Sequence, residues 1–196
     1  MGQHNSGRPS IGAATACFVS MLVMSGCADV GEVTVLTVDA QAYVSAAANP
    51  QRTVIVEVYD IRQTARRERT ALEVSMGNIR FEPPEDQIIR ELVQAKADSL
   101  LGQRAAIEPL PNILCGIRVF DATTPSTLLY WDMTVEIELV LRAGNEERTA
   151  RGRATGRTFI WPTEERLAKI THMAMTVLAD DLEIALTDLL AAPINE

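Results

Sequence analysis

The sequence predicts an α+β fold, a two-layer sandwich in which a small, mostly antiparallel sheet carries two helices on one face. Two segments have apolar residues at helical spacing, and one strand-like segment precedes the first of them. Three strand-like segments joined by short turns separate the two helices, so the order is β-α-β-β-β-α. Packing both helices on one face of the sheet would bury both apolar helix surfaces.

The first expected strand and helix have clear local signals. Residues 53–60, TVIVEVYD, are strongly β-branched, as strands are. Residues 78–82, NIRFE, are compatible with a short edge strand. The helix is expected over residues 83–102, because Pro84 and the two acids after it suit a first turn and Gly102 suits the stop.

Three further strands and a long helix are expected to complete the domain. The strands are read at residues 112–122, 128–142 and 147–157. Trp161-Pro162-Thr163 then interrupts the pattern, and a helix runs from Thr163 to about residue 190 with acids in its first turn. The chain therefore ends with a helix long enough to cover the sheet.

The arginine-rich stretch 147–157, ERTARGRATGR, is predicted to be one strand of a hairpin. Gly144-Asn145 suits a two-residue type II′ turn. That turn places residues of opposite charge, and one pair of threonines, opposite each other: Arg142 and Glu147, Glu138 and Arg151, Glu136 and Arg153, Asp132 and Arg157, Thr134 and Thr155. A slip of one residue would move the charges to the core face.

Two alternatives treat the same arginines as a ligand site. A phosphate loop is disfavoured because GRATGRT is one residue too short and Arg157 replaces the lysine. A basic docking patch would need unpaired arginines. The opposite face of this strand holds small residues, Ala150, Gly152, Ala154 and Gly156. We expect this row to let the backbone of the C-terminal helix come close.

The N-terminus resembles a secretory signal. Arg8 is followed by an apolar stretch, IGAATACFVSMLVM, and by small residues, and that stretch is too short for a comfortable membrane-spanning helix. MSGC, ending at Cys27, resembles the lipobox of bacterial lipoproteins. We expect residues 1–26 to be a lipoprotein signal peptide, residues 27–52 a lipidated N-terminus with a tether or edge strand, and residues 53–196 a single α+β domain.

The lipobox resemblance implies a covalent diacylglycerol and an N-acyl chain on Cys27, and no other cofactor. The alternative is an ordinary secretory signal or signal anchor in which Cys27 is incidental. In the enteric sorting pattern, aspartate directly after the cysteine retains a lipoprotein in the inner membrane. Ala28 stands there and favours the outer membrane, facing the periplasm, while Asp29 keeps the inner membrane as the alternative.

Composition and motifs argue against several function classes. The net charge of −8 gives no general attraction to nucleic acid. The cysteine spacing matches no zinc pattern, His4 and His172 add no cluster, and no catalytic motif stands out, so we expect neither a metal site nor an enzyme. Cys115, in an apolar run, is expected to be a buried small hydrophobe.

Three features remain as binding candidates. Arg62, Arg66, Arg67 and Arg69 lie in a loop with few acids and are either solvated or contact an anionic partner such as lipid phosphate, lipopolysaccharide or an acidic protein. Lys96 and Asp181 fall inside the apolar stripes of the two helices. These two side chains either extend to solvent or overhang the sheet edge, pair between the helices, or mark a ligand pocket.

The layout resembles two groups of small outer-membrane lipoproteins, the YajG-like family and the LptE lipopolysaccharide-assembly family. The resemblance is carried by the MSGC lipobox, VEVYDIR with Asp60 and Arg62, the alternating hairpin, and the ending LADDLEIALTDLL. It implies a non-enzymatic accessory or binding subunit in envelope assembly or transport, with a protein partner in the envelope. The alternative is a lipoprotein that itself binds a lipid or a glycolipid of the lipopolysaccharide type.

Overall fold

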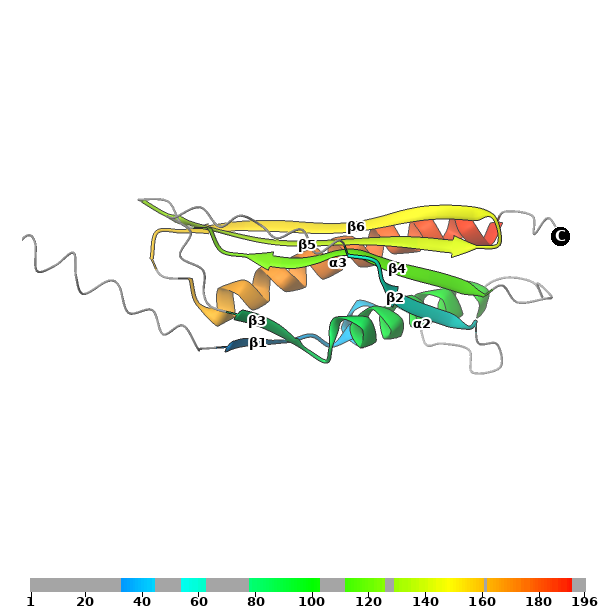
Figure 1. Cartoon of the computed structure of the whole chain (residues 1–196), viewed down its shortest axis with the longest axis horizontal. Coiled ribbons are helices and arrows are strands. Elements are labelled where there is room, and N and C mark those ends of the chain that lie inside the picture. Colours follow the sequence, from blue (N-terminus) through cyan, green and yellow to red (C-terminus); the bar gives the residue numbers. More distant parts are fainter. Residues whose placement is uncertain are drawn as a thin grey trace, which may run out of the picture. The chain divides into compact units, whose positions relative to one another are not determined.

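The computed structural model describes residues 33–44, 54–62, 78–102, 112–125, 129–160 and 162–191, which all belong to the compact unit Val33–Glu196. Its elements, in chain order, are β1 (Val33–Thr37), a 3-10 helix η1 (Ala40–Tyr43), β2 (Val56–Asp60), β3 (Asn78–Glu82), α2 (Glu85–Gly102), β4 (Ile113–Thr123), β5 (Trp131–Ala143), β6 (Glu146–Thr158) and α3 (Glu164–Ala191) (Figure 1). This is the α+β architecture that the sequence predicts.

The strands form two sheets. The larger sheet has the order β2-β4-β5-β6, in which β4 and β5 are antiparallel, β5 and β6 are antiparallel, and β2 is parallel to β4. The smaller sheet pairs β1 with β3 in parallel, so NIRFE is a strand that pairs with the segment before residue 38. The four-stranded sheet is therefore mostly antiparallel, as expected, and the parallel β1–β3 pair is an addition to the predicted order.

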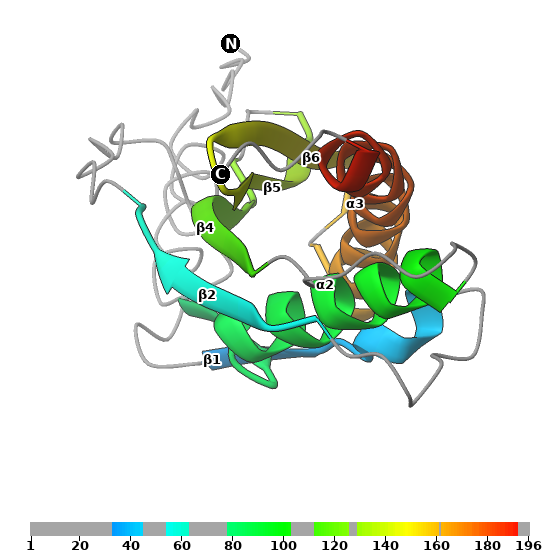
Figure 2. The same ribbon diagram turned by 90° about the vertical axis from the view of Figure 1, so that its right-hand side faces the viewer.

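Both helices pack on one side of the four-stranded sheet (Figure 2). The α3 helix contacts β6 and β5, whereas α2 contacts β2, η1 and α3. One continuous apolar core lies between the sheet and the two helices, and Ile88, Ile137, Leu139 and Leu178 are fully buried in it. The two-layer arrangement with both helices on one face is confirmed.

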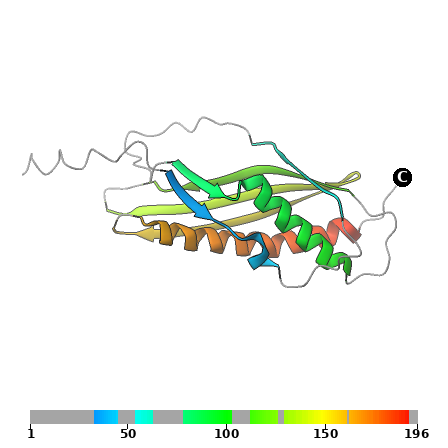
Figure 3. The ribbon, with the colours of Figure 1, turned by 90° about the horizontal axis from the view of Figure 1, so that it is seen from below.

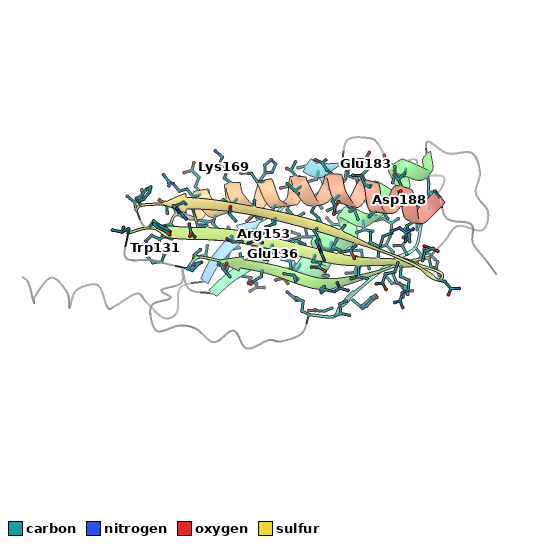
Figure 4. The ribbon with its side chains drawn as sticks, turned by 90° about the horizontal axis from the view of Figure 1, so that it is seen from above. Trp131, Glu136, Arg153, Lys169, Glu183 and Asp188 are labelled. Atoms are coloured by element: carbon teal, nitrogen blue, oxygen red, sulfur yellow. The ribbon has the colours of Figure 1, made fainter. Side chains whose placement is uncertain are left out.

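The β5–β6 hairpin has the register that the charges indicate. Its turn contains Gly144 with φ of +58°, a conformation that favours glycine. Each charge pair predicted from the sequence is a cross-strand pair in the structure: Arg142 with Glu147, Glu138 with Arg151, Glu136 with Arg153, Asp132 with Arg157. Glu136 and Arg153 lie beside each other on neighbouring strands (Figure 4).

The small residues of β6 let α3 approach closely, as predicted. A β-carbon on Gly152 would lie 2.3 Å from the carbonyl oxygen of Ala174 and 2.6 Å from the β-carbon of Leu178. No ordinary side chain fits there unless the α3 backbone moves. Thr163 caps the N-terminus of α3: its hydroxyl oxygen accepts a hydrogen bond from the backbone amide of Arg166, 3.4 Å away.

Candidate functional site

Arg62 is the one member of the predicted arginine group that lies in the described part of the chain, since Arg66, Arg67 and Arg69 lie outside it. Its guanidinium donates to both carboxylate oxygens of Asp60, with distances from 2.6 to 3.0 Å, and Glu85 lies 3.8 Å away. The hydrogen bonds from Arg62 lower the pKa of Asp60. An anionic ligand at Arg62 would therefore compete with a carboxylate already in place.

The outer face of the four-stranded sheet is a network of alternating charges. Glu138 lies between Arg118 of β4, at 2.7 Å, and Arg151 of β6, at 3.3 Å. Burial raises the pKa of Glu138, but the hydrogen bonds from both arginines outweigh this effect and the net pKa is lowered. The Arg157 and Asp132 side chains are 2.8 Å apart, and those of Arg142 and Glu147 are 2.7 Å apart.

Most hairpin arginines thus have acidic partners on this face. Arg153 differs: among the residues that the structure describes, its guanidinium forms no ion pair with Glu136, although the two residues are cross-strand neighbours. Because the hairpin register gives most of these arginines an acidic partner, the main argument for an anion-binding loop at residues 147–157 is removed.

Lys96 and Asp181, the charges within the apolar stripes, both have specific partners. The Lys96 ammonium lies 2.8 Å from a Glu183 carboxylate oxygen and joins α2 to α3. Asp181 accepts a hydrogen bond, 2.7 Å long, from the backbone amide of Arg151 on the edge strand β6. Lys96 therefore pairs between the helices, one of the alternatives. Asp181 lies at the sheet edge, as another alternative has it, and there accepts from the Arg151 amide, a partner that the sequence did not indicate.

Exposed apolar side chains form one group along the outside of α3. Met173 and Val177 are each 48% exposed and Ile184 is 63% exposed. Their spacing places them on one face of the helix, which we call the α3 stripe. The apolar spacing of this helix would place Val177 with the buried residues, but Val177 is exposed, because the core lies on the side of Leu178 and Leu182.

A second exposed group lies where β5 starts and β6 ends. Leu129 is 78% exposed, Phe159 77% and Ile160 63%. The rings of Tyr130 and Phe159 meet edge to face with centroids 6.2 Å apart, and the Arg157 guanidinium lies 3.8 Å above the Tyr130 ring. We call Leu129, Tyr130, Phe159 and Ile160 the hairpin-end cluster. Its sequence signal is the apolar pair Phe159-Ile160 directly after a strand of small and charged residues.

The titratable groups associated with catalysis have structural roles here. Cys115 is fully buried, and burial raises the pKa of its thiol to about 12, which keeps it in the unreactive protonated form. The Nδ1 atom of His172 lies 2.8 Å from the Tyr43 hydroxyl oxygen, so this histidine ties α3 to η1. Within the described ranges, no group of three or more His, Cys, Asp or Glu residues is placed to hold a metal ion.

The remaining sequence predictions concern the N-terminus. Cys27 lies outside the described residues, six positions before β1 begins at Val33. No helix in the described part of the chain is long and apolar enough to cross a membrane.

Comparison with known proteins adds little to this geometry. No family model and no curated protein matches the chain. Among solved structures, it is similar to a crystal structure titled as an uncharacterized protein, with 12% identity over 80% of this chain and 85% of that chain and a TM-score of 0.29. A score that low supports no inference about fold or function.

Proposed function

We propose that the protein is a bacterial lipoprotein, anchored through acyl chains on Cys27 in the outer membrane and facing the periplasm. The sequence Met24-Ser25-Gly26-Cys27 supports this proposal, because it combines an apolar signal with a lipobox. Each acyl chain contributes roughly 0.8 kcal/mol per buried CH₂ group, so more than one chain anchors a protein stably. The anchored domain acts as a non-enzymatic accessory or binding subunit in envelope assembly or transport.

A binding role fits the distribution of side chains better than catalysis does. In the described part of the chain, the buried thiol, the buried lysine and the histidine all have structural surroundings or partners. By contrast, the α3 stripe exposes three apolar side chains. Exposed apolar groups of this kind are common at surfaces that contact another macromolecule.

The lipid anchor is tested by replacing its acceptor. Cys27→Ser should abolish labelling by radioactive palmitate and leave the signal peptide uncleaved, whereas Cys17→Ser should do neither. Normal labelling of Cys27→Ser would end the lipoprotein proposal. Separation of inner and outer membranes by density then locates the labelled wild-type protein.

The partner is tested by photo-crosslinking in intact cells. A photoreactive amino acid at Val177 or Ile184 reports on the α3 stripe, and one at Glu57, an exposed residue on β2, is the control. The proposal expects one reproducible envelope protein crosslinked from the stripe and absent from the control. Crosslinks to lipid alone would favour the alternative, a lipid- or glycolipid-binding lipoprotein.

A further inference from the structure

The hairpin-end cluster is an apolar surface at one end of the domain. Trp131, the first residue of β5, lies at this end, and Glu183 and Asp188 of α3 lie toward the other (Figure 4). Trp131 pairs with Thr158, the last residue of β6, so Phe159 and Ile160 continue from the same end of the hairpin. The exposed side chains of the cluster therefore form a tip and are not spread along the sheet.

The strand that follows the proposed lipid anchor begins toward the same end. Figures 1 and 3 show β1 starting on the side where β5 starts and β6 ends, and running away from it toward η1. Its first residue, Val33, is six residues after Cys27. Six residues span at most about 20 Å even when fully extended. If Cys27 carries acyl chains, the start of β1 cannot leave the immediate neighbourhood of the bilayer.

We propose that the hairpin-end cluster inserts its apolar side chains into the interface of the phospholipid bilayer in which the protein is anchored. This inference rests on the proposed lipidation of Cys27. The short tether keeps the bilayer at a high effective concentration for this surface, which is not so for a diffusing protein partner. Insertion adds a second point of contact and fixes the orientation of the domain on the membrane.

The chemistry of the cluster fits the interfacial region. Leu129, Phe159 and Ile160 supply apolar surface, while Tyr130 has an aromatic ring with a polar end, a residue type enriched where a membrane meets water. The nearby charges balance, because Arg157 is paired with Asp132 and the first turns of α3 carry both acids, Glu164 and Glu165, and cations, Arg166 and Lys169. Insertion should thus be equally strong in vesicles of neutral phosphatidylcholine and vesicles that contain phosphatidylglycerol.

The two tryptophans of the chain provide a test without an added label. They are Trp131, at the start of β5, and Trp161, next to Ile160 in the sequence. The processed, lipidated protein is reconstituted into phosphatidylcholine vesicles whose acyl chains carry bromine near the headgroup end. Insertion should quench tryptophan fluorescence by about half relative to unbrominated vesicles, because bromine acts only on fluorophores at interfacial depth.

A matched pair of double variants identifies the surface responsible. Phe159→Ser/Ile160→Ser should lose most of the quenching, whereas Val177→Ser/Ile184→Ser on the α3 stripe should retain it. All four side chains are exposed, so both variants should keep the wild-type circular dichroism spectrum. Absence of quenching in the anchored wild-type protein would overturn the proposal, and this is the result expected if the tip binds a protein partner instead. Undiminished quenching in Phe159→Ser/Ile160→Ser would also overturn it.

Intact mass measurement of the same sample separates this inference from the lipidation on which it rests. Acyl chains on Cys27 without tryptophan quenching would overturn insertion and leave the lipoprotein proposal standing. If the mass shows no acyl chains, the mature chain with a histidine tag before residue 27 is bound to nickel-chelating lipid. Quenching in that arrangement supports an insertion-competent tip, and its absence overturns the inference.

Discussion

Lys96 of α2 and Glu183 of α3 form an ion pair of 2.8 Å in which the two partners are unequally buried. The Lys96 side chain is 6% exposed, whereas that of Glu183 is 54% exposed. The pair spans 87 positions of sequence and joins the two helices that cover the sheet. The Lys96 ammonium is therefore almost buried, while the Glu183 carboxylate that neutralises it remains exposed to water.

This asymmetry predicts different results for the two partners. Glu183→Gln leaves the buried ammonium without its charged acceptor and should lower the free energy of unfolding by about 1 kcal/mol. Lys96→Met removes the buried charge itself and should change stability by less than about 0.5 kcal/mol, or raise it. Urea denaturation measures both, with Asp180→Asn as an exposed acid of the same helix for control. A larger loss in Lys96→Met than in Glu183→Gln would contradict this account.

Two glycines of β6 provide a test of how closely α3 approaches the sheet. The methyl group of Gly152→Ala would meet backbone atoms of α3, so the helix must shift, and the free energy of unfolding should fall by about 2 kcal/mol or more. At Gly156 the nearest atom is the terminal Cδ1 of Ile170, 2.5 Å away, which can rotate aside. Gly156→Ala should therefore stay within about 1 kcal/mol of the wild-type protein. Thermal and urea denaturation measure both variants. Equal losses of unfolding free energy at the two positions would show that the close approach of the α3 backbone to Gly152 does not limit the side chain there.

The hairpin shows why part of this fold can be predicted from sequence. Its register follows from local information, since Glu136, Glu138, Arg151 and Arg153 alternate with core residues and one glycine-containing turn joins the strands. Pairing of β1 with β3 could not be predicted in this way. Val33 and Asn78 are 45 positions apart, and parallel pairing depends on the tertiary structure between them.

Contacts between distant segments also limit what can be predicted of the site. The positions of Lys96 and Asp181 can be recognised in the sequence, because each is a charge inside an apolar stripe. Their partners, Glu183 and the Arg151 amide, were not predictable, because each depends on how α3 lies against another element. The hairpin-end cluster was missed because Phe159 and Ile160 look like ordinary core residues until the structure shows their exposure.

Asp181 should protect one backbone amide at the edge of the sheet. The β6 strand is an edge strand, and the Arg151 amide donates to the Asp181 carboxylate and not to a neighbouring strand. Asp181→Ala should speed hydrogen exchange at this amide by about tenfold, while Asp181→Asn, which keeps an acceptor oxygen, should have a smaller effect. Exchange measured by NMR checks this, with Asp180→Ala as the neighbouring control. An unchanged rate at Arg151 in Asp181→Ala would show that this hydrogen bond does not limit opening.

The buried Cys115 thiol should make stability depend on pH in the alkaline range. Burial raises its pKa from 9.0 to about 12 in the folded protein. Below about pH 8 the thiol is almost fully protonated in both states, so its contribution to stability changes little. Between that value and about pH 12 the unfolded chain releases the proton while the folded chain retains it, so the free energy of unfolding falls as pH rises, by at most about 1.4 kcal/mol per pH unit.

Two measurements isolate this effect in the Cys17→Ser/Cys27→Ser protein, where Cys115 is the remaining thiol. Cys115→Ala in that background should remove the alkaline decrease attributable to the thiol, so the difference between the two unfolding curves should narrow from about pH 9 upward. Reaction with Ellman's reagent at neutral pH should be slow in the folded protein and rapid in urea, because only unfolding exposes the thiol and returns its pKa to the ordinary range. Rapid labelling of the folded protein would place Cys115 at an accessible surface and remove the physical basis of both expectations.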